Sequence, residues 1–505
     1  MERREIADRF EAYRPLLSER EWPDMIDAFT RSIPSTMWIH PTRISPHSIV
    51  DHFAQDQHHL NALPYVPGGF SSPRPMKWGR RFEFRSGLIH LQEAASMLPP
   101  MVLQPEPGEL VLDLCAAPGG KSAQLSLMME NRGTLVVNDL SFNRLRALRA
   151  TQERLGLKNM VLCAQEGQNL LKGHPPCFDK VLVDAPCSCE GTLRKKGKWS
   201  YEPDDQNFKA RLIATQKALL LQALKLTKAG GRVVYSTCTL DPMENEGVID
   251  AVLNQWTHLK KMGGAHCDLE LEEITIPALK TSPGIESWHG AQWSDTLKRA
   301  LRVYPHQNDT GGFFIASFKL KSTVSQPRTL PAITQWAKPE RYTDTKREAL
   351  YSWASRTFGL DKEAWGQVSF TETNTRYVSS VSCDLILPPT RYQVAGLPTI
   401  YIRGAVPRLT TAGALEWGRL ATRSVLELSS KTAVDDYYAG RVQTITTDLS
   451  TGVCIPLFLG HPLGLGYLST DQKKSSKHLT SEYPKRLRLA EGCSAFETPE
   501  QAERT

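Results

Sequence analysis

The sequence predicts an α/β protein built on an open, mainly parallel sheet that helices cover on both faces, followed by a β-rich C-terminal region. Between residues 76 and 320, short apolar runs alternate with amphipathic segments, a pattern typical of βαβ units. With 505 residues, the chain exceeds the roughly 250–300 residues at which a single core usually stops growing. A polar stretch at 325–348 then separates the alternating region from short strands and turns. We therefore expect two or three domains.

The N-terminal part predicts a helical segment followed by a mixed one. Ile6, Phe10, Tyr13, Leu16 and Leu17 recur at helical spacing, and the Pro- and Gly-rich stretch 63–75 marks a boundary. We expect a small N-terminal helical and mixed segment at 1–75, an α/β domain at 76–320, a linker region at 321–390 and a C-terminal domain at 391–505.

The elements of the α/β domain follow from the alternation. The expected strands are 109–114, 134–139, 160–165, 180–186 and 232–238, and the expected helices lie near 121–130, 142–155, 211–228 and 243–255. Residues 302–320 predict a closing hairpin with its turn at 308–312.

Composition limits the class of protein. The 61 Lys and Arg residues exceed the 54 Asp and Glu residues, which permits a polyanionic partner such as RNA without requiring one. Ten cysteines are too few for a disulfide scaffold, and the first ten residues lack the apolar core of a signal peptide. The prolines and glycines of 453–470 predict loops and strands, and we expect no membrane span. We expect an intracellular protein, with nucleus and cytoplasm both open.

The loop at 110–122 is the most informative stretch. An apolar strand ends at Asp113, a run of small residues from Cys115 to Gly120 follows, and a helix starts at Lys121. Ligands of open α/β sheets bind outside the carboxyl ends of the strands, where glycines allow a close approach. A P-loop would need glycine at position 115, where cysteine stands, so nucleotide hydrolysis is disfavoured.

Two acidic residues extend this site. Asp139 ends the next strand, where an acid commonly binds the hydroxyls of a ribose. The absence of G-x-G-x-x-G favours a nucleoside cofactor such as S-adenosylmethionine over a dinucleotide. Glu166, just past the third strand, could accept the adenine amino group. The alternative is that both acids cap helices or loops.

Thiols follow two further strands. Asp184, Cys187 and Cys189 come after one strand and Cys238 after another, an arrangement that suggests covalent chemistry. We expect Cys163, Cys383 and Cys454 to be small buried hydrophobic residues. Cys187 and Cys189 stand too close for the usual zinc spacing, and no matching histidine pair accompanies them, so we expect no metal.

Four motifs together resemble the Sun-family RNA cytosine-5 methyltransferases. They are CAAPGGK (115–121), DAPCSCEG (184–191), YSTCTLDPMENE (235–246) and HQNDTGGFF (306–314), and LQEAASMLPP (91–100) resembles the segment before the cofactor loop. The resemblance covers roughly residues 1–320. The segments 33–40 and 299–318 are most similar to the tRNA-modifying subgroup.

The resemblance implies a Rossmann-like sheet that binds S-adenosylmethionine. The implied cofactor residues are Cys115, Ala116, Ala117, Pro118, Gly119, Gly120, Lys121, Asp139, Arg144, Glu166 and Asp184. The family usually has aspartate where Glu166 stands, which changes the reach of that carboxylate. A solvated helix face is the alternative for Arg144.

The resemblance also implies roles in catalysis. Cys238 is the nucleophile that attacks carbon 6 of cytosine, and Cys187 assists release of the product. Asp184 contacts the pyrimidine edge and stabilises charge, and Lys121 contacts the target nucleotide. Cys189 stands where the family more often has glycine and receives no role.

Three basic segments suggest RNA contacts. Residues 80–85 and 192–199 interleave positive charge with Phe82, Phe84 and Trp199, which could stack on bases. The basic stretch 471–488, with 425–442 and 453–460 before it, resembles a small PUA-like barrel. We expect a monomeric enzyme that methylates cytosine carbon 5, most of all in tRNA. Ribosomal RNA is the same-chemistry alternative, and a non-catalytic RNA-binding or assembly factor is disfavoured by the two thiols.

Overall fold

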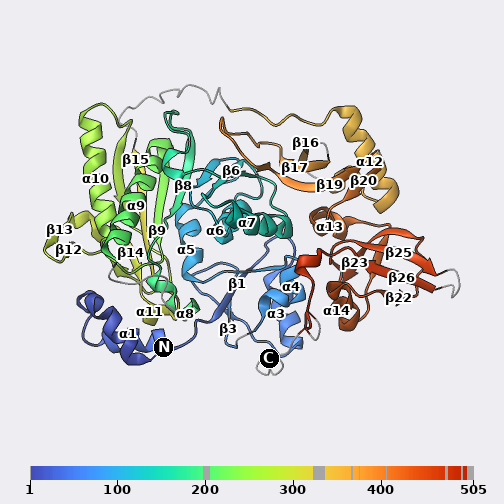
Figure 1. Cartoon of the computed structure of the whole chain (residues 1–505), viewed down its shortest axis with the longest axis horizontal. Coiled ribbons are helices and arrows are strands. Elements are labelled where there is room, and N and C mark those ends of the chain that lie inside the picture. The colour runs from blue at the N-terminus through green and yellow to red at the C-terminus, as the bar shows by residue number, and fades with distance from the viewer. Residues whose placement is uncertain are drawn as a thin grey trace.

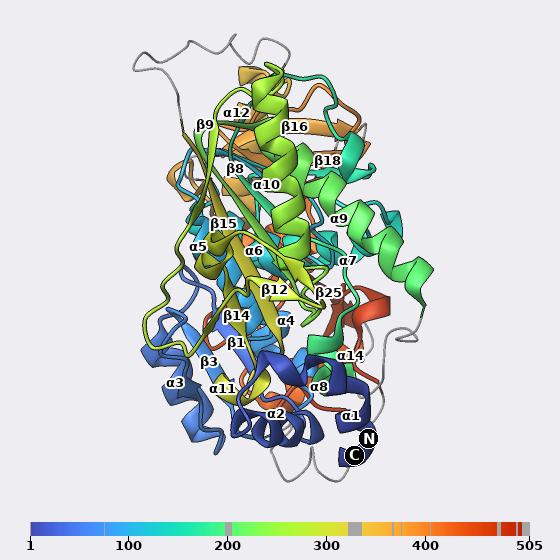
Figure 2. The same cartoon turned by 90° about the vertical axis from the view of Figure 1, so that its left-hand side faces the viewer.

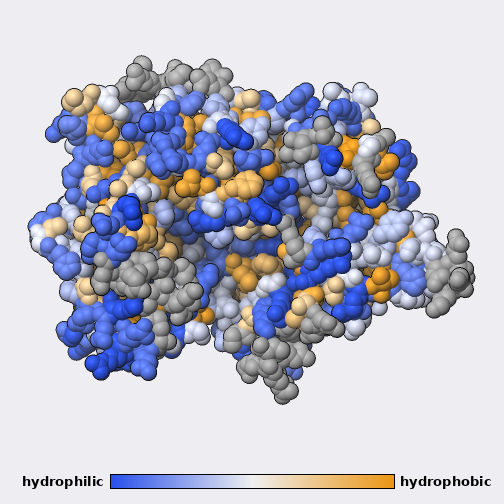
Figure 3. All heavy atoms as spheres, in the orientation of Figure 1, coloured by the Kyte–Doolittle hydropathy of each residue, from blue (hydrophilic) through white to orange (hydrophobic). Residues whose placement is uncertain are grey.

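The computed structural model describes residues 2–74, 76–196, 205–321, 336–365, 368–374, 376–404, 406–471, 476–490 and 493–496. An α/β unit and a β-rich C-terminal unit lie side by side, with the N-terminal segment below them in the view of Figure 1. Hydrophilic side chains predominate on the face shown in Figure 3, with apolar ones between them across its middle.

The central sheet has the strand order β11-β14-β15-β9-β8-β5-β6-β7-β18, and β10 pairs with β15. Its parallel strands are β5 (Leu110–Asp113), β6 (Thr134–Asn138), β7 (Met160–Cys163), β8 (Phe178–Asp184) and β9 (Thr227–Thr237). All five are among the predicted strands. Because they run parallel, their carboxyl ends meet at one edge, where Asp184 pairs in register with Ser236.

Helices cover both faces of this sheet, as predicted (Figure 2). Side chains of α9 (Gln206–Leu226) and α10 (Glu246–Lys261) share one core with β8. Those of α5 (Leu98–Leu103), α6 (Gly120–Met128) and α7 (Phe142–Leu155) share another with β5 and β6.

The predicted closing hairpin is confirmed in its pairing. Strand β14 (Leu301–Val303) pairs antiparallel with β15 (Phe313–Lys321), and β15 continues onto β9. The connection is longer than the turn expected at 308–312, because the short helix α11 (Pro305–Asn308) occupies its first half. The remaining short strands are β10 (Asp268–Glu272), β11 (Ser282–Pro283), β12 (Ser287–Trp288) and β13 (Ala291–Gln292).

The N-terminal segment contains two helices and a separate sheet. Helix α1 (Arg3–Phe10) buries Ile6 and Phe10, and α2 (Glu21–Thr30) buries Met25 and Phe29. Together with Tyr13 between the helices, these side chains form a core with Leu193 and Tyr304 of the α/β unit. The sheet has the order β2-β3-β1-β4, with α3 (Pro46–Gln55) packed beside it. Its strands are β1 (Ser35–Ile39), β2 (Asn61–Ala62), β3 (Gly69–Ser72) and β4 (Ile89–Leu91). Since β4 belongs to it, this unit continues past the boundary predicted at 63–75.

Much of the region 321–390, which we expected to be a linker, is folded. Helix α12 (Asp344–Phe358) buries Leu350, Ala354 and Phe358 in a core shared with Trp417. The adjoining sheet, β16-β17-β19-β20, has strands β16 (Val368–Asn374), β17 (Tyr377–Ser382), β19 (Leu397–Arg403) and β20 (Val406–Leu409). The polar composition of 325–348 concealed the start of α12, whose apolar residues recur only from Leu350 onward.

The β-rich C-terminal region is confirmed, while its PUA-like character stays a prediction. A second sheet has the order β21-β23-β25-β26-β22, with β24 paired to β23. Its elements are β21 (Val425–Glu427), β22 (Gln443–Ile445), β23 (Gly452–Phe458), β24 (His461–Pro462), β25 (Gly466–Asp471) and β26 (Ser476–Ser481). Helices α13 (Thr411–Trp417) and α14 (Lys431–Ala439) accompany the two sheets, and β18 (Val394–Ala395) pairs with β7. Among the described helices, none has the length and apolarity needed to cross a membrane.

Candidate active site

The glycine loop joins β5 to α6 at the carboxyl edge of the sheet. Ala116 N–H donates to the Asn138 carbonyl (2.8 Å), and the Ala117–Pro118 peptide is cis. Gly119 has φ +106° at the N-terminus of α6, and a Cβ there would lie 2.8 Å from Cγ of Leu148. Only glycine tolerates this backbone and this approach of α7. Gly120 follows as the first residue of α6. At the start of the loop, burial raises the pKa of the Cys115 thiol.

Asp139 lies at the end of β6 directly against this loop. Its carboxylate accepts hydrogen bonds from Ala117 N–H (3.2 Å) and Ser141 N–H (2.9 Å) and pairs with Arg144 Nη1 at 3.4 Å. Arg144 also donates to the Ala117 carbonyl. The structure thus brings Asp139, Arg144 and the loop together, as the predicted cofactor site requires. The same carboxylate accepts a hydrogen bond from the backbone N–H of Ser141, which caps the start of α7. The structure is therefore also consistent with the alternative that Asp139 stabilises a helix start.

Glu166 lies beyond β7 and is exposed. Its carboxylate accepts from Asn169 Nδ2 (2.7 Å), so adenine recognition by Glu166 stays a prediction. The residue before it is anchored by the buried Asn138, which donates to the Gln165 carbonyl (3.0 Å) and accepts from Gln165 N–H (3.1 Å). The sequence analysis missed Asn138, although a polar residue beside Asp139 at a strand end was the available signal.

Lys121 and Asp184 form an ion pair where β5, β8 and β9 end. Lys121 Nζ lies 2.7 Å from Asp184 Oδ2 and 5.1 Å from the ring centre of Phe313. Ser236 Oγ donates to the other carboxylate oxygen (2.8 Å). Burial lowers the pKa of Lys121, but the Asp184 carboxylate outweighs this effect and leaves the pKa raised. The amino group therefore stays charged beside its carboxylate.

The three predicted strand-end thiols meet at the same edge. Cys187 Sγ lies 3.4 Å from Cys238 Sγ and 3.8 Å from Cys189 Sγ. The three sulfur atoms lie within 4.8 Å of one another, close enough to share a metal ion, so the expected absence of metal stays a prediction. Cys189 has φ +64°, a left-handed conformation that glycine adopts more easily.

Cys187 and Cys238, the two thiols with predicted catalytic roles, are both harder to ionise than free cysteine. Contacts with Cys189 and Cys238, together with burial, raise the pKa of Cys187 well above its usual value. A hydrogen bond with Cys187 lowers the pKa of Cys238, but contact with Cys189, burial and nearby Asp184 outweigh it, so this pKa is also raised. Either thiol therefore reacts only when a base accepts its proton.

Buried contacts fix the loop that carries Cys187. Gly191 N–H donates to the Cys238 carbonyl (2.9 Å), and Gly312 N–H donates to the Gly191 carbonyl (3.0 Å). Glu244 accepts from Ser188 N–H (3.1 Å) and Gln216 Nε2 (2.7 Å). Burial, with Glu190 nearby, raises the pKa of Glu244 to about 7. The sequence analysis quoted Glu244 within its motif and gave it no role.

The remaining cysteines divide between buried and exposed. Cys163 and Cys454 are buried, as predicted. Cys383 is exposed, and the expectation that it is buried is wrong. It follows the last residue of β17, where the chain leaves the sheet and turns toward solvent.

The basic segment 80–85, expected to contact RNA, is largely an internal junction. Arg81 is 1% exposed and donates to Glu83 and Asp56, and the buried Phe82 stacks on Phe496 and contacts Phe458 edge to face. Arg85 donates to the Leu487 carbonyl (2.5 Å). The RNA-contact prediction is therefore wrong for Arg81 and Phe82. Arg81 is committed to carboxylates of the N-terminal unit, and Phe82 packs against the C-terminal region, to which Arg85 also binds.

The second basic segment, 192–199, is only partly described. Arg194 is buried and donates to the carbonyls of Thr310 (2.9 Å) and Ser32 (3.2 Å). Its guanidinium therefore connects α8 (Leu193–Lys196) to the N-terminal segment and to the loop before β15. Lys195 is exposed. Trp199 lies outside the described residues, as do 472–475 of the third basic stretch.

Comparison with known proteins agrees with this geometry. A family model described as "16S rRNA methyltransferase RsmB/F" matches residues 100–319. A tRNA (cytosine(49)-C(5))-methyltransferase of Pyrococcus abyssi is 37% identical over 52% of this chain and 81% of its own length. The ribosomal RNA small subunit methyltransferase F of Erwinia tasmaniensis is 29% identical over 85% of each chain.

A solved structure, a methyltransferase homologue from Pyrococcus horikoshii, matches 62% of this chain and 94% of its own, with 34% identity and a TM-score of 0.52. The fold, the motifs and these relatives lead to one conclusion. The chain belongs to the S-adenosylmethionine-dependent RNA cytosine-5 methyltransferases of the Sun (RsmB/F) family.

Proposed function

We propose that this protein methylates carbon 5 of cytosine in RNA through a covalent bond between Cys238 and the base. The observation that carries the proposal is the 3.4 Å separation of the Cys187 and Cys238 sulfur atoms, at the sheet edge that also holds the Lys121–Asp184 pair. Carbon 5 of cytosine is a weak nucleophile, and addition of a thiolate to carbon 6 makes it electron-rich.

The first step forms the sulfur–carbon bond. Asp184 takes the proton of the Cys238 thiol and passes it to the ring nitrogen N3, while sulfur adds to carbon 6. Asp184 already accepts hydrogen bonds from Lys121 and Ser236, which hold the carboxylate in place for this transfer. The charged Lys121 beside it stabilises the negative charge that develops on the ring.

S-adenosylmethionine supplies the methyl group that carbon 5 of the adduct receives. The chain holds this cofactor with the loop 115–121 and Asp139, whose carboxylate faces the same loop. Gly119 lets this loop pack closely against Leu148 of α7, which fixes the position of the loop.

Product release requires loss of the carbon-5 proton. Cys187, as the thiolate, takes this proton; the C–H electrons form the carbon 5–carbon 6 double bond, and the bonding pair of the sulfur returns to Cys238. The proton on N3 then returns to Cys238. The proton that Cys187 had lost to solvent is the single proton that the overall reaction releases. The raised pKa of Cys187 makes it a strong base once ionised.

Two RNA classes are candidates for the substrate. The tRNA methyltransferase relative supports tRNA, with 37% identity over 52% of this chain. The relatives named as ribosomal RNA small subunit methyltransferases align over the C-terminal region as well, one of them over 92% of this chain. We propose small-subunit ribosomal RNA as the first candidate substrate and tRNA as the second. The reason is that a ribosomal RNA enzyme aligns over 92% of this chain, including the C-terminal region, whereas the tRNA enzyme aligns over 52%.

Incubation with S-adenosylmethionine carrying a deuterated methyl group, and with either tRNA or small-subunit ribosomal RNA lacking prior methylation, tests the proposal. Nucleoside mass spectrometry should find labelled 5-methylcytidine in one RNA class. Label on another atom of cytosine, or on another base, would contradict the proposed chemistry, and label in tRNA alone would reverse the order of substrates.

A further inference from the structure

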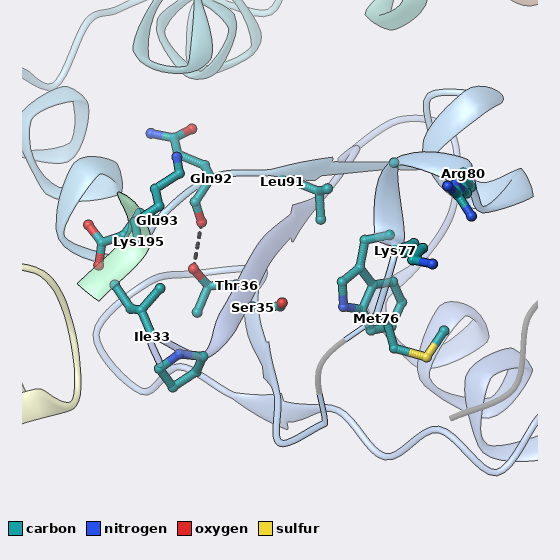
Figure 4. A pocket seen from close by; sticks show the side chains of 13 residues that line it. Ile33, Ser35, Thr36, Met76, Lys77, Arg80, Leu91, Gln92, Glu93 and Lys195 are labelled. Atoms are coloured by element: carbon teal, nitrogen blue, oxygen red, sulfur yellow. Dashed lines mark hydrogen bonds between the residues drawn. The ribbon is translucent and has the colours of Figure 1, made fainter. Parts of the chain in front are cut away.

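A groove lies between the N-terminal sheet and the catalytic edge. Its volume is about 430 Å³, and it is lined by 33–36, 76–80 and 91–93, with Lys195 of α8 (Leu193–Lys196). Figure 4 shows Lys77 and Arg80 on one side of this groove and Lys195 with Glu93 on the other. We refer to it as the N-terminal groove.

Backbone hydrogen bonds connect Glu93, which lines the N-terminal groove, to the segments that carry Cys187 and Cys238. Glu93 Oε1 accepts from Gly311 N–H (3.0 Å), and Gly312 N–H donates to the Gly191 carbonyl (3.0 Å). Gly191 N–H in turn donates to the Cys238 carbonyl (2.9 Å). Gln92, another lining residue, packs against Gly120, which immediately precedes Lys121. A Cβ on Gly120 would lie 3.4 Å from the Gln92 side chain. The groove therefore lies beside the segments that carry Cys238 and Lys121.

Positive charge predominates in the N-terminal groove. Its described lining contains Lys77, Arg80 and Lys195 against the single carboxylate of Glu93. That carboxylate is engaged by the backbone N–H groups of Ser96 (3.1 Å) and Gly311 (3.0 Å). A strand with negative charge at regular intervals is the complement of such a lining.

A second cavity lies on the other side of a lining residue that it shares with the groove, Gly79. It has a volume of about 410 Å³ and reaches α7 and the C-terminal residues 483–488. Arg85, Arg154 and Arg488 line it, with Glu153 as the one acid of its described lining, and Glu153 is paired with Arg149 (2.9 Å). We refer to it as the junction cavity.

The guanidinium of Arg154 illustrates the uncompensated charge there. It donates to the carbonyls of Phe84 (2.8 Å) and Ile89 (3.1 Å), lies 2.6 Å from His90 Nδ1 and stacks on Phe84 at 3.8 Å. These partners are all neutral in charge or aromatic, and burial lowers the pKa of Arg154 to about 9. A desolvated cation whose partners are neutral gains from an anion entering the cavity.

We propose that the N-terminal groove and the junction cavity form one track for the RNA strand that flanks the target cytosine. Phosphates next to the target contact Lys195, Lys77 and Arg80, and a phosphate further along enters the junction cavity between Arg154 and Arg488. The track joins the catalytic edge to the C-terminal region through Gly79. This inference rests on the proposed function only in taking RNA as the substrate.

Salt-dependent RNA binding tests the track with variants at both ends. Lys77→Ala/Arg80→Ala should weaken RNA binding about tenfold and reduce the slope of log affinity against log salt by about one per lost phosphate contact. Arg488→Gln should reduce the slope by about one as well. The control is Lys260→Ala/Lys261→Ala, which removes two exposed charges at the end of α10 and should leave the slope unchanged. Cofactor affinity should equal that of the wild type in every variant.

Photocrosslinking of the wild-type protein complements these variants, because Arg488 also donates to the carbonyls of Tyr483 and Ser481 and its loss could disturb the fold. RNA with 4-thiouridine on either side of the target should crosslink to residues 76–80 and 483–488. Crosslinks confined to other faces, or slopes for the groove variant equal to the control, would overturn the track. Crosslinking needs no methyl transfer, so a failure of the proposed chemistry is seen separately, as absence of 5-methylcytidine with the wild type.

Discussion

The catalytic edge and the 81–83 junction both pair basic residues with carboxylates, yet they differ in exposure. At the edge, the side chain of Asp184 is 30% exposed beside Lys121. At the junction, Arg81 and Glu83 are 1% and 0% exposed, and His52 and Asp56 complete the cluster. An ion pair that solvent reaches can exchange a partner for a substrate, whereas a fully buried pair is committed to holding segments together.

This difference shows why charge in a sequence is an incomplete guide to RNA contact. The segment 80–85 is dense in charged and aromatic residues, but Phe82 and Arg85 contact the C-terminal region and Arg81 pairs with carboxylates of the N-terminal unit. Arg80 of this segment lines the groove together with Lys77, which precedes the segment and belongs to no conspicuous motif. We expect variants of the edge to lose chemistry while keeping stability, and variants of the junction to do the opposite.

The largest effect should come from Cys238→Ala. Removal of the nucleophile should lower the methylation rate at least about 1,000-fold, because the adduct cannot form. Thermal melting and cofactor binding should match the wild type, since the thiol is only partly buried. A variant that keeps its activity would show that the edge is no more reactive than the junction.

Arg81→Met should give the largest loss of stability. It leaves the buried Glu83 carboxylate without its Arg81 partner and with the hydrogen bond from His52, and breaking a buried ion pair typically costs about 3–5 kcal/mol. Urea denaturation measures the change. The matched control is Lys346→Met, which breaks the exposed pair with Glu372 and should leave the free energy of unfolding unchanged. Equal midpoints for both variants would contradict the structural role of the junction.

Asp139→Asn should weaken cofactor binding by about 10- to 100-fold, because the neutral amide loses charge-assisted hydrogen bonds to the ribose and to the loop at Ala117. Calorimetry with S-adenosylmethionine measures the affinity, and Asp344→Asn on α12 serves as a control of the same chemistry. Wild-type affinity in Asp139→Asn would remove Asp139 from the cofactor site.

A smaller, pH-dependent effect is expected at Glu244. Its pKa is raised to about 7 in the folded protein from an ordinary value of 4.5. Between these pH values the folded state binds more protons, so the stability that protonated Glu244 contributes is lost as pH rises through 7. Glu244→Gln cannot titrate, and it should gain roughly 1–3 kcal/mol relative to the wild type between pH 4.5 and pH 8. Parallel stability curves for the two proteins would show that Glu244 is ionised throughout.

The sequence predicted the parallel sheet and most of the site because both depend on local pattern. Strand ends are readable from apolar runs, and parallel strands bring Asp139, Asp184 and Cys238 to one edge whatever the loops do. Asn138 and Glu244 escaped notice because their roles arise from buried backbone groups, which become visible only in three dimensions.

The junction was mispredicted for a related reason. The partners of Phe82 lie near residues 458 and 496, and no local spacing reveals contacts between segments so far apart. The same holds for α12, whose buried face depends on Trp417.

The most direct test of the account is the fate of the covalent bond in Cys187→Ala. If Cys187 releases the product, this variant should transfer the methyl group once and accumulate a protein–RNA adduct that survives denaturing electrophoresis. The adduct should require S-adenosylmethionine and should vanish in Cys187→Ala/Cys238→Ala. An adduct that forms with Cys238→Ala instead would exchange the roles of the two thiols, and full turnover by Cys187→Ala without an adduct would contradict the division of labour between them.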